Sequence, residues 1–121
     1  MQVGFDATAF ENVTEGDALY MRTSDGQVGK ATASDGTSEA ATVVGFANAT
    51  ASANTTVKVI VVGLKTMSGL DAGDLYFLSP STAGAITLTP PSSAGQAVVR
   101  LGEAATTTTL AIQIEPPIKL S

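Results

Sequence analysis

The sequence of 121 residues contains no cysteine, no histidine and no tryptophan. Without cysteine the chain cannot form a disulfide or a thiolate metal site, which suits assembly in a reducing cytoplasm. Without histidine it lacks the side chain most used for acid and base catalysis at neutral pH, and the commonest transition-metal ligand. We therefore expect a protein that is not an enzyme and that holds no metal or cofactor.

Charged side chains are also scarce, and acidic ones outnumber basic ones by 11 to 6, for a net charge of -5. The six cations are spread along the whole chain: Arg22, Lys30, Lys58, Lys65, Arg100 and Lys119. Binding to phosphates depends on clustered cations that displace counterions. Nucleic acid is therefore not an expected ligand.

Long hydrophobic runs are missing as well. The longest, residues 57–64, contains Lys58 and Gly63 and is far shorter than the roughly 20 residues of a membrane-spanning helix. The first residues, MQVGFD, have neither the basic start nor the apolar stretch of a secretory signal. We expect neither membrane insertion nor secretion.

The charged fraction is 14%, compared with roughly 25% in an ordinary soluble domain, and the mean hydropathy is +0.26. A surface with so little charge suits a protein whose outside is covered by neighbouring molecules. The alternative is that the many threonines and serines keep an uncharged monomer soluble.

What the sequence does contain is apolar residues with a period of two. In residues 107–114 the side chains of Leu110, Ile112 and Ile114 fall on one face, which is typical of a half-buried strand. Residues 57–62 are apolar on both faces except at Lys58, as in a central strand covered on both sides. Further strands are predicted at 17–22, 27–32, 42–47, 74–79, 86–89 and 96–104.

Turn residues separate these strands. Asp25-Gly26 lies between two of them at hairpin distance, and Ala83-Gly84 and Gly95 separate later ones. The only predicted helical turn is at residues 68–72. The fold class expected is all-β, a single small barrel or sandwich with extended terminal arms.

The chain also resembles itself at an offset of about 52 to 57 residues. TEGDALYMR at 14–22 matches DAGDLYFLS at 71–79. Two further pairs follow in the same order: ATVVGFANAT at 41–50 with AVVRLGEAAT at 97–106, and TTVKVIVV at 55–62 with TTTLAIQI at 107–114. We predict two duplicated four-strand halves, about 14–62 and 71–114, within a β domain at 14–115. The alternative is chance recurrence in a chain of simple composition.

Few residues are candidates for chemistry. Gly16-Asp17 and Gly73-Asp74 each lead into a strand, and an aspartate there can cap the turn by accepting backbone N–H groups. A catalytic carboxylate would need a partner acid, base or cation, and the sequence places none beside them. Asp25, Asp35 and Glu39 could ligate Ca²⁺, but they lack the dense alternating spacing of a calcium loop. No catalytic, metal or cofactor residue is therefore predicted.

Six strings follow one another along the chain: EGDALYM at 15–21, DGQVGKA at 25–31, VVGFA at 43–47, LDAGDLYFLSPSTAGAIT at 70–87, VVRLGEA at 98–104 and LAIQIEPPI at 110–118. Taken in this order, they resemble the small all-β decoration (cement) proteins of phage capsids. Together they cover most of the chain from residue 15 onward.

The resemblance implies a structural virion protein that forms a homotrimer on the outer capsid surface, after synthesis in the host cytoplasm. It would bind major capsid protein subunits and stabilise the shell without catalytic residues. Many weak contacts on a symmetric lattice add up to strong binding, so a weakly charged surface fits this role. The alternative is a trimeric tail-fibre or receptor-binding module of a phage. A third class, a small hydrolase or lyase, lacks an acid and base pair.

Residues 1–13 are predicted to form an N-terminal arm, and residues 116–121 a C-terminal tail. Val3, Phe5 and Phe10 lie in a stretch that the duplicated strands do not need, so they require another burial site. We predict that they contact the capsid or a neighbouring subunit, with the arm adding to an exposed sheet edge. The competing interpretation is that the arm pairs within its own domain as an edge strand.

Overall fold

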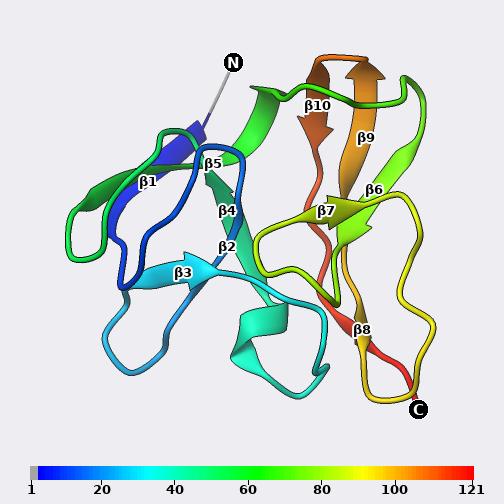
Figure 1. Ribbon diagram of the computed structural model, residues 1–121, viewed down its shortest axis with the longest axis horizontal. Coiled ribbons are helices and arrows are strands. Elements are labelled where there is room, and N and C mark those ends of the chain that lie inside the picture. The colour runs from blue at the N-terminus through cyan, green and yellow to red at the C-terminus, as the bar shows by residue number, and fades with distance from the viewer. Residues whose placement is uncertain (1–2) are drawn as a thin grey trace.

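A computed structural model describes residues 3–121, and its regular secondary structure is almost entirely β-strand (Figure 1). The strands are β1 Val3–Thr8, β2 Ala18–Met21, β3 Val28–Lys30, β4 Val43–Ala47, β5 Thr56–Thr66, β6 Leu75–Leu78, β7 Ile86–Thr87, β8 Ala97–Val98, β9 Arg100–Thr106, β10 Thr109–Ile112 and β11 Ile118–Lys119. The predicted all-β class is confirmed. None of the helical structure in this part of the chain is long and apolar enough to cross a membrane.

Nine strands form one strongly curled antiparallel sheet in the order β3-β2-β4-β5-β10-β9-β6-β7, and β1 pairs with β5 beside this path. The long strand β5 lies at its centre, as the doubly apolar run at 57–62 predicts. Val59 and Ile60 are both buried although they point to opposite faces, so β5 is covered on both sides there.

Strands are present at every predicted position, but the single strand predicted at 96–104 is divided at Val99 into β8 and β9, which lie in different sheets. The helical turn predicted at 68–72 is wrong, because these residues form bends and a turn. The single short helix is instead a 3₁₀ turn at Glu39–Ala41, where the Ser38 hydroxyl accepts a hydrogen bond from the Ala40 N–H. Ser38 is a favourable residue for this position because its side chain can satisfy a free N–H at the start of the turn.

The two predicted halves have the same strand order. Read from the outside of the sheet inwards, the first half runs β3-β2-β4-β5 and the second runs β7-β6-β9-β10. In each half the second strand along the chain lies outermost, followed by the first, third and fourth. The hydrogen bonds agree: the Gly16 N–H donates to the Ala47 carbonyl as the Gly73 N–H does to that of Ala104.

The ladders extend this correspondence to β1. On one side β5 pairs Val59 with Ala47, and on its other side it pairs Val59 with Phe5 of β1. In the second half β10 pairs Leu110 with Ala104 and, on its other side, with Lys65 at the end of β5. Residues 63–66 of β5 therefore pair with β10 in the second half as β1 pairs with β5 in the first half. Each half has five strands rather than the predicted four.

The two predicted arms both pair within the chain. β1 runs antiparallel to β5, and beyond it Ala9 bridges to β3 and Val13 to Ala51. Ala9 and Val13 are both buried. Of the two interpretations of the N-terminal segment, pairing within its own domain is the one that the structure shows. At the other end β11 pairs with β8 as a two-stranded sheet.

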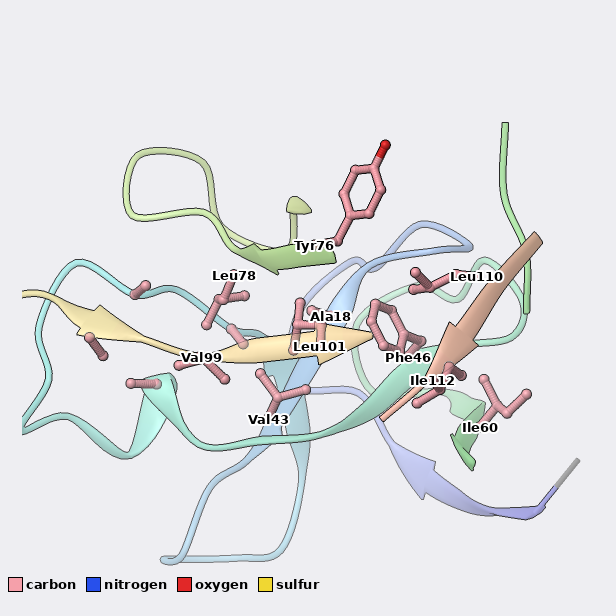
Figure 2. Close-up of a cluster of buried hydrophobic side chains, with 14 of the residues drawn as sticks. Ala18, Val43, Phe46, Ile60, Tyr76, Leu78, Val99, Leu101, Leu110 and Ile112 are labelled. Atoms are coloured by element: carbon pink, nitrogen blue, oxygen red, sulfur yellow. The ribbon is translucent and has the colours of Figure 1, made fainter. Parts of the chain in front are cut away.

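Two apolar clusters fill the fold. The smaller lies inside the first half, where Leu19, Val28 and Val59 pack together. The larger joins the halves: Phe46 and Ile60 of the first half pack with residues of the second such as Leu101 (Figure 2). The first half is thus buried on both faces of its sheet, while the second half has one face packed against the first.

Candidate interaction surfaces

The predicted contact residues Val3, Phe5 and Phe10 occupy two different environments. Val3 and Phe5 lie on β1 and are 47% and 37% exposed. Phe10 packs edge-on against Tyr20, with ring centroids 5.8 Å apart, and the guanidinium of Arg22 lies 4.0 Å above its ring. Phe10 is therefore held by side chains of its own chain, while Val3 and Phe5 remain accessible.

Val3 and Phe5 belong to a shallow hollow of about 260 Å³ that we call the N-terminal surface. It is lined by Val3, Gly4, Phe5, Asp6, Asn48, Lys58, Val59 and Ile60. An exposed ion pair at its rim joins Lys58 Nζ to Asp6 Oδ1 at 3.5 Å. In the part of the chain that the structure describes, β1 pairs along one edge over residues 3–8, so its other edge is open.

A second surface, the outer face of the second half, follows from the ladder register. Directly paired residues share a face of the sheet. The paired residues on this face are Leu64, Ala111, Glu103, Leu75, Phe77 and Arg100. Leu64 is 54% exposed and Leu75 is 36% exposed. The sequence does not reveal this surface, because in the run Leu75, Tyr76, Phe77 and Leu78 both faces are apolar.

Two hollows open on this outer face. One of about 480 Å³ is lined by Gly73, Asp74, Leu75, Phe77 and Leu88. The other, of about 460 Å³, is lined by Phe77, Val98, Arg100, Glu115, Pro116, Pro117 and Ile118. Within residues 3–121, Arg100 Nε is the one buried side-chain nitrogen or oxygen that lacks a hydrogen-bond partner. Phe77 lines both hollows.

The aspartates of the two Gly-Asp turns differ: Asp17 caps its turn, whereas Asp74 is exposed. Asp17 Oδ2 accepts the Thr14 N–H at 2.8 Å, as predicted for a turn cap. Burial of this carboxyl raises its pKa, and the Thr14 hydrogen bond opposes that shift. Asp74 occupies the same place in the second half but is exposed.

The three carboxylates considered for Ca²⁺ accept hydrogen bonds from side chains within the chain. Asp25 accepts from Arg22 at 2.6 Å, which lowers the Asp25 pKa, and Asp35 accepts from the Thr37 hydroxyl, which lowers the Asp35 pKa. Glu39, the third residue weighed for Ca²⁺, accepts from the Thr23 hydroxyl. Among the described residues no group of three or more carboxylates is placed to hold a metal ion.

An ion pair between a buried lysine and an exposed glutamate joins the two halves. Lys65 at the end of β5 is 2% exposed, and its Nζ lies 2.7 Å from Glu15 Oε2 in the first half. The hydrogen bond and the charge of Lys65 lower the pKa of Glu15. This pair is a structural contact, because a lysine almost never becomes fully buried unless it is paired.

In comparisons with known proteins, no protein-family model matches this chain and no curated protein matches it.

Proposed function

We propose that this protein is a structural virion protein that decorates and stabilises a phage capsid by binding major capsid protein subunits. In this role it is not an enzyme and acts on the outer capsid surface as a homotrimer. The observation that carries the proposal is the N-terminal surface, where the accessible apolar side chains of Val3 and Phe5 lie on a strand with an open edge.

An open edge and apolar neighbours together suit docking to a β-rich partner. The free N–H and C=O groups of β1 can pair with an extended segment of a capsid subunit, which gives affinity through main-chain hydrogen bonds. Val3 and Phe5 would be buried in the same contact. Proteins usually protect such edges with charge, bulges or cover. Asp6 and Lys58 provide little of this, because they neutralise each other at the rim.

The scarcity of charge supports the same role. A single contact through the small N-terminal surface is weak. A trimer that engages several lattice positions at once gains strongly in avidity. Because only 14% of residues are charged, few charged side chains lose their water when the surface is covered by neighbouring molecules.

The test is co-sedimentation with phage heads that lack this protein. We expect the wild-type protein to pellet with heads, and Phe5→Glu to reduce the bound fraction at least tenfold, because a charge would be buried in the contact. Thr89→Glu adds the same charge at an exposed position of the second half and should bind normally. Circular dichroism and melting curves must show that both variants are folded.

Two results would contradict the proposal. If wild-type protein ignores heads and pellets with isolated tails, the alternative of a tail-fibre or receptor-binding module is favoured instead. If folded Phe5→Glu binds heads as well as the wild-type protein does, the N-terminal surface is not the docking site.

A further inference from the structure

We infer that the outer face of the second half is the contact between copies of this chain, and that three such faces meet around the symmetry axis of the trimer. The inference rests on the self-association proposed above but not on capsid binding. The partner is a second copy of the chain, and the reason is that the two halves repeat the same strand order.

The same face exists twice in the molecule. In the first half the corresponding paired residues are Gly4, Ile60, Phe46, Ala18, Tyr20 and Val43. They match, in that order, Leu64, Ala111, Glu103, Leu75, Phe77 and Arg100 of the second half. This correspondence is set by the strand pairing. Phe46 pairs with Ala18 on one side and Ile60 on the other, as Glu103 pairs with Leu75 and Ala111.

In the first half the centre of this face is covered, while Gly4 at its edge is exposed and Tyr20 is half-buried. Ala18 and Phe46 are 0% exposed and Ile60 is 2% exposed, because the second half of the same chain packs on them. In the second half the matching Leu75 is 36% exposed and Glu103 is exposed. The chain thus contains one covered and one uncovered version of a single surface, and the cover in the covered version is a unit of this same fold.

The polar groups on the uncovered face also fit a second copy. Arg100 pairs with Phe77 and Glu103 with Leu75, so the two charged residues lie two positions apart along β6. Because their charges are opposite, neighbouring copies can pair the arginine of one with the glutamate of the next. The hollow between Leu75, Phe77 and Leu88 provides space for an apolar side chain of the neighbour.

The experiment measures the mass of the protein alone by size-exclusion chromatography with light scattering, at concentrations from about 1 to 100 µM. We expect the wild-type protein to have about three times the monomer mass of 12.1 kDa. Leu75→Glu should run as a monomer, with at least a hundredfold weaker association, because it buries a charge at the centre of the contact. Phe5→Glu is the matched control, since Phe5 is 37% exposed and Leu75 is 36% exposed. It should remain a trimer.

The outcomes separate the inference from the proposed function. A trimeric wild type with a folded, monomeric Leu75→Glu supports the inference, whether or not heads are bound. A folded Leu75→Glu that stays trimeric overturns this inference alone. A monomeric wild type at every concentration overturns both the inference and the proposed self-association. If Leu75→Glu fails to fold, Leu75→Ser, a smaller polar change at the same site, takes its place and is judged by the same results.

Discussion

At the scale of single residues, two glycines occupy matching positions where strands approach closely. A Cβ atom built on Gly45 would lie 2.7 Å from the Ile60 carbonyl oxygen, and one built on Gly102 would overlap the carbonyl oxygen of Ala111. The two carbonyls belong to matching residues of β5 and β10, so the requirement for glycine is part of the duplicated architecture. Gly45 directly precedes Phe46, which pairs with Ala18. Gly102 directly precedes Glu103, which pairs with Leu75.

We predict that Gly102→Ala lowers the free energy of unfolding by about 3 kcal/mol, since the new methyl group can be accommodated only by moving backbone. Gly69→Ala is the control. Gly69 has a φ of 77° but no atom within 4 Å of a built Cβ, so the expected loss there is only the roughly 1–2 kcal/mol of a left-handed alanine. Urea unfolding followed by circular dichroism measures both. Equal losses in the two variants would show that the close approach at Gly102 is not a constraint.

These residue roles could be predicted only in part from sequence. The capping role of Asp17 followed from local chemistry, because its acceptor reaches an N–H three residues away. Gly45 and Gly102 could not be identified, since their contacts lie on strands distant in sequence. The buried state of Lys65 was equally hidden: its partner Glu15 is 50 residues away.

At the scale of elements, the alternation of apolar residues placed every strand from β2 to β10. It did not find β1, because residues 3–8 bury little of their surface on either face and so carry no clear period. It also did not find β11, whose two residues are both exposed. Three sequence matches predicted two similar halves, and their strand order is the same. The fifth strand of each half could not be predicted, since β1 and residues 63–66 share position but little sequence.

We predict that deleting residues 2–10 prevents stable folding. The deletion removes six ladder positions along β5 and the buried Ala9. At about 1 kcal/mol for each hydrogen bond, with Val57 and Val59 also losing cover, the loss approaches the whole stability of a typical domain, roughly 5–15 kcal/mol. Circular dichroism and thermal melting of the shortened chain measure the effect.

Removing residues 116–121 is the comparison for that deletion. It takes away the two ladder positions of β11, so a modest fall in melting temperature is expected. A chain lacking residues 2–10 that melts like the full-length protein would restore the interpretation of the N-terminal segment as a separate arm.

At the scale of the whole molecule, the halves are not independent domains. The larger apolar cluster contains residues of both halves. The single strand β5 also belongs to both, since it pairs with β1 in the first half and with β10 in the second. The sequence predicted the two halves but not how they pack, because pairing order and face coverage depend on contacts between distant segments. For the same reason it could not show which copy of the duplicated face is left uncovered.

We therefore predict that both halves unfold in one cooperative transition. The chain has two tyrosines and no tryptophan, with Tyr20 in the first half and Tyr76 in the second. Tyr76→Phe leaves tyrosine fluorescence as a probe of the first half, and Tyr20→Phe leaves it as a probe of the second. In each variant the urea midpoint by fluorescence should coincide with the midpoint by far-ultraviolet circular dichroism, which reports the whole sheet.

Tyr76→Phe should be the less stable variant by about 1 kcal/mol, since the Tyr76 hydroxyl accepts the Asp71 N–H. If fluorescence and circular dichroism give different midpoints in either variant, the halves unfold separately and the shared cluster does not couple them.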